Sequence, residues 1–189
     1  MKEQRRHQRI RFNNFPRMLI GQLGLSGRGE LENLSLGGML IHTVLPLKVG
    51  ASFGCEFDVF DSPLIDLSAQ VVNKIGDRYG ARFQAGPISE LLIQGAIDNA
   101  LSSGRASVLS INELQGRKVM RVAGGLNDGL RNDFLHGLSK VGVDDLDLSG
   151  VTQVDSAGMA LCRIAVDQYK VLVVSQSSLV QAMMSEEAA

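Results

Sequence analysis

Arg5-Arg6-His7-Gln8-Arg9 and Asn33-Leu34-Ser35-Leu36-Gly37-Gly38 are the two stretches that decide how this chain is interpreted. The first places three arginines within five residues near the N-terminus. An arginine side chain offers a planar fork of donors that matches phosphate oxygens and also stacks on flat bases. Such a cluster can therefore surround a compact dianion.

The second stretch combines short polar side chains with a pair of glycines. In an extended strand, Asn33 and Ser35 lie on one face and Leu34 lies on the other. The amide and hydroxyl groups are then suited to hydrogen-bond a guanine edge, and the glycines leave room for a turn or for the close approach of a ligand.

The region around these motifs, from about residue 18 to residue 83, has the pattern of a β domain. Short apolar runs such as Met18-Leu19-Ile20 alternate with turn signals, which include Gly21, Ser26-Gly27, Gly37-Gly38 and Gly76-Asp77. Several short strands with frequent turns predict a sandwich or a small barrel. A helix is expected from Pro87 to about Leu101, closed by Ser102-Ser103-Gly104.

The ordered pair of motifs, RRxxR followed by [D/N]xSxxG, resembles the signature of the PilZ family, whose members bind cyclic di-GMP. The resemblance covers roughly residues 5 to 86 and includes Tyr79-Gly80-Ala81-Arg82-Phe83, which is similar to the last strand of that family. It implies a six-stranded antiparallel β-barrel. It also implies that phosphates and guanines are held by Arg5, Arg6 and Arg9, above a floor formed by Asn33, Ser35 and Gly38. Asn33 stands where the family more often has Asp, so it keeps an acceptor oxygen without the charge.

The second half of the chain alternates between strand and helix patterns. Strands are expected at 107–111, 118–122, 145–148 and 170–174, and helices at 130–138, 155–166 and 178–184. This order predicts an α/β domain whose sheet is covered by helices. We therefore expect two domains, residues 1–103 with the ligand site and the boundary helix, and residues 104–189.

A motif in this half runs from Asp147 to Gly158 and reads DLSGVTQVDSAG. It resembles the STAS family, the sulfate transporter and anti-sigma-factor antagonist domains, over residues 107 to 184. The resemblance implies that Ser156 is phosphorylated by a partner kinase and that this switches binding of a protein partner. The alternative is that Asp155 and Ser156 merely cap a helix. The segment from Gly158 to Lys170 is short for the family, which puts the usual partner-binding surface in doubt.

The distribution of charge and the two cysteines indicate the kind of partner and the cellular compartment. The net charge is −1, but the first 17 residues are strongly basic. Glu3 is their only acidic residue, and their Lys and Arg residues are Lys2, Arg5, Arg6, Arg9, Arg11 and Arg17. This basic arm indicates an anionic partner. No apolar run approaches the roughly 18 residues that span a bilayer. With Cys55 and Cys162 far apart in apolar settings, we expect free thiols and a cytoplasmic location.

The sequence favours a receptor over an enzyme. It contains no nucleophile–base set, phosphate loop or dinucleotide fingerprint, and His7, His42 and His136 lack metal-ligand spacing, so neither a metal nor a cofactor is expected. One function is a cyclic di-GMP receptor that relays occupancy to an unidentified protein partner through the STAS-like domain. The alternative is a partner-switch adaptor with a degenerate PilZ domain, controlled by Ser156 phosphorylation or by another polyanion. Nucleic acid has weak support, since only Phe12 and Phe15 interleave with the basic residues.

Overall fold

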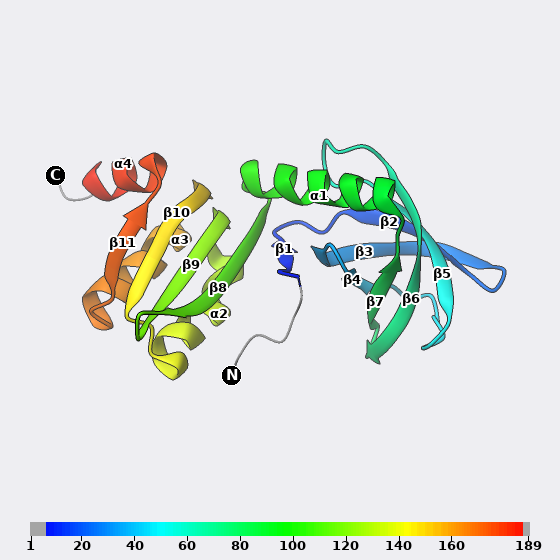
Figure 1. Cartoon of the computed structure of the whole chain (residues 1–189), viewed down its shortest axis with the longest axis horizontal. Helices are drawn as coiled ribbons and strands as arrows, with labels where there is room; N and C mark the ends of the chain where they lie inside the picture. The colour runs from blue at the N-terminus through cyan, green and yellow to red at the C-terminus, as the bar shows by residue number, and fades with distance from the viewer. Residues whose placement is uncertain (1–6, 187–189) are drawn as a thin grey trace. The chain divides into compact units, whose positions relative to one another are not determined.

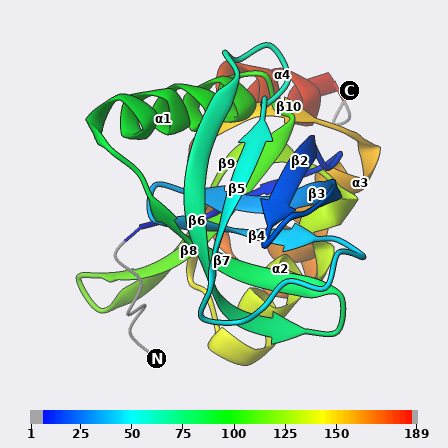
Figure 2. The ribbon, with the colours of Figure 1, turned by 90° about the vertical axis from the view of Figure 1, so that its right-hand side faces the viewer.

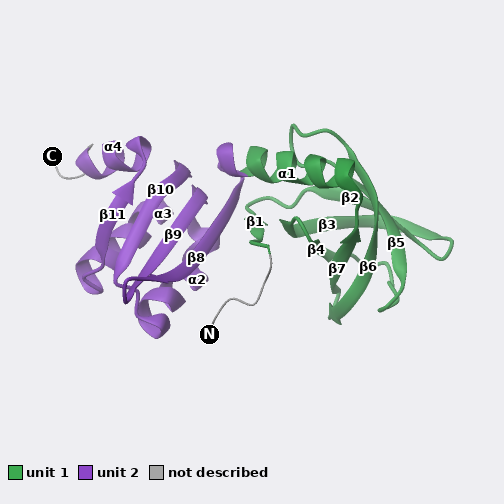
Figure 3. Cartoon of the chain, in the orientation of Figure 1, with its two compact units in different colours: residues 1–100 green, residues 101–189 purple. Residues whose placement is uncertain are grey.

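The computed structural model describes residues 7–186 and divides the chain into two compact units, residues 1–100 and residues 101–189 (Figure 3). The two units are described separately below.

The first unit is built on a closed antiparallel β-barrel (Figure 1 and Figure 2). Six strands pair in the order β3-β2-β5-β6-β7-β4, and β4 pairs again with β3 to close the ring. A short additional strand, β1, pairs with the end of β3. The strands are β1 Ile10–Phe12, β2 Arg17–Gln22, β3 Leu25–Ser35, β4 Gly38–His42, β5 Ser52–Phe57, β6 Ile65–Ile75 and β7 Arg78–Gln84. The six-stranded antiparallel barrel implied by the family resemblance is confirmed.

The barrel closes around buried side chains that alternate with exposed ones, most regularly along β5. In β5, Phe53, Cys55 and Phe57 are buried while the residues between them are exposed. The period of two places every second side chain in the interior, so burial of these apolar groups stabilises the ring. Leu34 of the NxSxxG motif is also fully buried, although a register shift between Leu31 and Asn33 interrupts the alternation in β3.

The hairpin between β2 and β3 turns at Leu23-Gly24, not at the glycines expected from the sequence. Gly21 lies within β2, and Ser26-Gly27 lies within β3. Both turn residues have positive φ, 53° for Leu23 and 80° for Gly24. Two-residue hairpins need this left-handed backbone to match the twist of their strands. An apolar residue rarely adopts it, which is why the sequence did not indicate a turn there.

A single long helix follows the barrel. Helix α1, Pro87–Ser102, has the expected bounds and buries Ile93, Ala96, Ile97 and Ala100 along one side. None of the helices within residues 7–186 has both the length and the apolar character that a membrane crossing requires.

The second unit contains a mixed four-stranded sheet in the order β11-β10-β9-β8 (Figure 1). β8 and β9 form an antiparallel hairpin, whereas β9, β10 and β11 run parallel. The strands are β8 Ala106–Leu114, β9 Arg117–Leu126, β10 Asp145–Val154 and β11 Leu172–Gln176. The helices are the 3-10 turn η1 Asp128–Leu130, α2 Arg131–His136, α3 Ser156–Arg163 and α4 Ser178–Glu186, and the π-helical turns η2 Gly137–Val141 and η3 Ile164–Gln168 extend α2 and α3.

Buried apolar residues join the helices of this unit to its sheet. Phe134 from α2, Leu161 from α3 and Val180 from α4 share a core with Met120 and Leu148 from the strands. β10 is longer than expected: the strand predicted at 145–148 runs on to Val154. Its parallel pairing with β9 continues there through two register shifts, which accommodate residues of low strand propensity such as Gly150.

Candidate functional site

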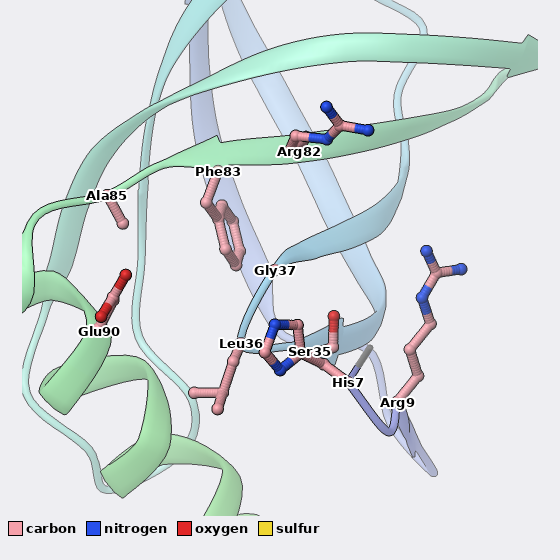
Figure 4. A pocket seen from close by; sticks show the side chains of 9 residues that line it. All are labelled: His7, Arg9, Ser35, Leu36, Gly37, Arg82, Phe83, Ala85 and Glu90. Carbon is pink, nitrogen blue, oxygen red and sulfur yellow. The ribbon is translucent and has the colours of Figure 1, made fainter. Parts of the chain in front are cut away.

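A pocket of about 680 Å³ opens at one end of the barrel (Figure 4). This volume is within the range of about 300–1,000 Å³ that is usual for small-molecule sites. Four segments far apart in the sequence contribute to it: the residues before β1, the β3–β4 turn, the end of β7 and the start of α1. The lining residues are His7, Arg9, Ser35, Leu36, Gly37, Arg82, Phe83, Ala85 and Glu90.

Strand pairing brings these segments together. Ile10 pairs with Leu34, so the residues just before β1 lie beside the end of β3. Gly38 pairs with Arg82, and the backbone N–H of Phe83 donates to the carbonyl oxygen of Gly37 at 3.2 Å. The backbone therefore holds three of the four segments in register.

Ser35 is the buried polar group of the pocket, with 4% of its surface exposed. Its hydroxyl donates to the carbonyl oxygen of Gly38 at 3.0 Å. The proton is used within the turn, and the lone pairs of Oγ stay available to accept a bond. Ser35 can thus present an acceptor to an N–H group of a ligand.

The two glycines of the motif have different surroundings. Gly37 lines the pocket, and a Cβ added to it would lie 3.1 Å from Cδ2 of His7. A Cβ added to Gly38 would lie 2.2 Å from the carbonyl oxygen of Ala81 in β7. Gly38 therefore lets two strands approach closely, and it is not among the residues that line the pocket.

The other predicted site residues have different placements. Arg9 lines the pocket, while Arg5 and Arg6 lie outside the described residues. Asn33 does not line it and pairs across the sheet with Arg11 and Leu40. Its Oδ1 atom is buried without a hydrogen-bond partner within residues 7–186. A buried acceptor without a partner is unfavourable, so a donor bound at this position would stabilise it.

The pocket has a cationic side that was only partly expected. Arg9 and Arg82 are both exposed, and neither forms an ion pair with a described residue. The sequence indicated Arg82 only as part of the family-like strand and not as a ligand group. Its position at the pocket follows from the β4–β7 register, which no local pattern shows.

A comparison with known protein families agrees with the family resemblance of the first unit. The model of the PilZ domain matches residues 3–97, about half of the chain. The chain belongs to the PilZ family. Among curated proteins, none matches it.

Several solved structures resemble this PilZ protein. The PilZ domain of YcgR from Escherichia coli, solved with c-di-GMP, has 21% identity and a TM-score of 0.45, over 51% of this chain and 91% of that one. A longer structure of E. coli YcgR in complex with c-di-GMP has 26% identity and a TM-score of 0.44, over 51% of this chain and 46% of that one. The Bacillus subtilis inhibitor of motility MotI/DgrA has 18% identity and a TM-score of 0.42, over 52% of each chain. The matches thus span only about half of the two longer proteins.

A separate feature lies outside the PilZ match, at the start of α3. Asp155 is the N-cap of this helix, and its carboxylate accepts from the backbone N–H of Gly158 at 2.8 Å. Ser156 occupies the first helical position and is exposed. A Cβ on Gly158 would lie 2.1 Å from the carbonyl oxygen of Leu126, so this glycine lets the helix pack closely on the end of β9. The stretch that resembles a STAS motif therefore forms a strand end and a capped helix start.

Proposed function

We propose that the PilZ domain of this protein is a receptor for cyclic di-GMP and binds it in the pocket of Figure 4. The observation that carries the proposal is the convergence of Arg9, Ser35 and Arg82 on one pocket, with no carboxylate paired to either arginine among the described residues. Family membership supports the class of ligand, because the PilZ motifs are those of cyclic di-GMP binding.

The chemistry of the pocket suits a dianion with two flat bases. Arg9 and Arg82 offer donors to the phosphates, and Arg5 and Arg6 would add to them as the RRxxR motif implies. The ring of Phe83, which projects into the middle of the pocket in Figure 4, offers a face on which a base can stack. Each hydrogen bond to a charged group contributes about 1.5–3 kcal/mol, and a net −8 kcal/mol corresponds to a Kd of about 1 µM.

Calorimetric titration of cyclic di-GMP tests this assignment. We expect Arg5→Ala, Arg9→Ala and Arg82→Ala each to weaken binding about tenfold or more, because each removes a charge-assisted contact. Arg17→Ala is the matched control: Arg17 is an exposed arginine of β2 that does not line the pocket. Equal affinity in the wild type and all of the variants would contradict the proposal.

Excess GTP or RNA in the same titration separates this function from the alternative. A cyclic di-GMP receptor keeps its affinity in their presence. A general polyanion site, as in an adaptor with a degenerate PilZ domain, loses it.

We further propose that the second unit passes ligand occupancy to a protein partner, with Ser156 as a modification site. Support comes from the resemblance to STAS domains and from the exposure of Ser156 at the start of α3. A phosphate there would lie near the positive end of the helix dipole and beside the carboxylate of Asp155. The added negative charge would repel an acidic partner surface.

Two experiments test the relay. Pull-down from the native host with and without cyclic di-GMP should recover a protein whose capture depends on the ligand. Mass spectrometry of the protein from the same cells should find phosphate on Ser156, and its absence under all growth conditions would reject the switch. A cytoplasmic location is part of the proposal, and the free, buried thiols of Cys55 and Cys162 agree with a reducing compartment.

A further inference from the structure

One residue of the pocket conflicts with simple anion binding. Of the described residues that line it, Glu90 alone carries a carboxylate. A carboxylate close to a phosphate repels it, so this group would weaken the binding of a dianion unless it meets another part of the ligand.

The placement of Glu90 separates it from the arginines. In Figure 4, Glu90 and Ala85 lie on one side of Phe83, and Arg82 and Arg9 lie on the other. The carboxylate is exposed and forms no ion pair or hydrogen bond with a described side chain, while the backbone N–H of Glu90 donates to the carbonyl oxygen of Gly86 at 3.0 Å. The pocket thus has a cationic side, an aromatic middle and an acidic side.

The backbone holds Glu90 in place. It lies in the first turn of α1, which begins at Pro87 directly after the loop from β7. A helical turn bonded in this way fixes the position of the side chain better than a loop does, as a residue that reads a ligand requires.

We propose that Glu90 determines specificity for guanine, with its carboxylate accepting hydrogen bonds from the N1–H and 2-amino groups of a base stacked near Phe83. Two adjacent donors match the two oxygens of a carboxylate, and bonds to an ionised acceptor are the stronger kind. The corresponding edge of adenine offers one donor and one acceptor, and hypoxanthine lacks the 2-amino donor. This inference rests on the proposed function, since it assumes a guanine dinucleotide in the pocket.

A purely structural role is the alternative explanation for Glu90, since it is an acidic residue in the first turn of a helix. A carboxylate in the first turn is favourable with the helix dipole whether or not it meets a ligand. Such a role affects the stability of α1 but not the choice between bases. A measurement of base discrimination therefore distinguishes the two.

The test compares cyclic di-GMP, cyclic di-inosine monophosphate and cyclic di-AMP by calorimetry on the full chain. The wild type should prefer cyclic di-GMP over the inosine analogue by about ten- to a hundredfold, because the analogue leaves one acceptor oxygen without its donor. Glu90→Ala should bring this ratio close to parity. Glu90→Gln should do the same and should bind cyclic di-AMP more tightly than the wild type, since an amide offers the donor and acceptor that adenine needs.

Glu56→Gln is the matched control, because it removes one negative charge from an exposed position of β5 away from the pocket. It should keep the wild-type ratios. Unchanged ratios in both Glu90 variants, with thermal unfolding showing that they are folded, would overturn this inference and leave the receptor proposal standing. If the wild type does not bind cyclic di-GMP at all, the receptor proposal fails and this inference fails with it.

Discussion

At the scale of single residues, the two neighbouring glycines of the NxSxxG motif have different surroundings. Gly37 faces the pocket, with the side chain of His7 as its nearest neighbour. Gly38 faces the backbone of β7, where a Cβ would lie 2.2 Å from the carbonyl oxygen of Ala81. One glycine of the motif therefore lines the pocket, and the other lets β4 and β7 pack closely.

Alanine substitutions should separate these two roles. Gly38→Ala forces β4 and β7 apart, and we expect it to lower the free energy of unfolding by about 1–3 kcal/mol. Gly37→Ala should change stability by less than about 0.5 kcal/mol, because the exposed ring of His7 can move, but it should weaken ligand binding by filling the pocket. Urea unfolding and calorimetry on both variants measure the two effects. The reverse pattern would show that the assignment of the glycines is wrong.

His42 is a titratable residue in the same unit, held between two carboxylates. Its Nε2 lies 2.6 Å from Oδ2 of Asp77, and its Nδ1 lies 3.7 Å from Oε2 of Glu30. The hydrogen bond to Asp77 is the main cause that raises the pKa of His42 above its ordinary value of 6.5, and the same bond lowers the pKa of Asp77. The charged pair is thus favoured in the folded state.

The pH dependence of stability follows from these directions. A raised histidine pKa contributes stability that is complete below pH 6.5 and is lost as the pH rises through the folded-state value. The lowered pKa of Asp77 contributes stability above about pH 4, which is lost at more acidic pH. We expect the difference in unfolding midpoint between wild type and His42→Gln to be largest between about pH 4 and pH 6.5. A difference that does not change with pH would contradict the ion pair.

At the scale of elements, helix α3 follows β10 almost directly, and Asp155, the residue between them, caps the helix. The Asp155 carboxylate satisfies the backbone N–H of Gly158, one of the donors that a helix start leaves unpaired. The backbone N–H of Asp155 in turn donates to the carbonyl oxygen of Leu126, so the cap is tied to the end of β9. The two hydrogen bonds of Asp155 thus connect the start of α3, where Ser156 is exposed, to the sheet of the second unit.

Removing this cap should destabilise the second unit. Asp155→Ala is expected to lower the free energy of unfolding by about 0.5–2 kcal/mol, the usual effect of losing an N-cap. Asp155→Asn keeps an acceptor oxygen and should retain most of the stability, and Ser156→Ala should have little effect because Ser156 does not cap the helix. Chemical denaturation followed by circular dichroism measures all three. Equal loss in the alanine and asparagine variants would assign the effect to charge and not to capping.

At the scale of the whole molecule, the described residues that line the pocket all belong to the first unit, while Ser156, the proposed modification site, lies in the second. Ligand binding stabilises the unit that holds the ligand, by about 2.7 kcal/mol at a concentration one hundred times the Kd. Any response in the other unit requires coupling between them.

Hydrogen exchange with and without cyclic di-GMP measures this coupling. We expect slower exchange in the strands that border the pocket, β3, β4 and β7, because binding favours the folded barrel. The relay predicts a second change in exchange at α3. A response confined to the barrel would reject the relay and leave the receptor intact, and the Arg9→Ala variant should abolish both changes.

The sequence by itself predicted a first unit of short strands, as a sandwich or a small barrel, the helix that follows it and the cap at Asp155, and it indicated Arg9 and Ser35 as candidate site residues. These depend on local patterns: the period of two in strands, short polar motifs, and the preference of Asp for helix starts. Only the tertiary structure decided that Arg82, Phe83 and Glu90 join the pocket and that Gly38 belongs to the barrel. The reason is that β7 reaches the motif through a long-range strand register, and local periodicity does not specify which distant strand a residue will face.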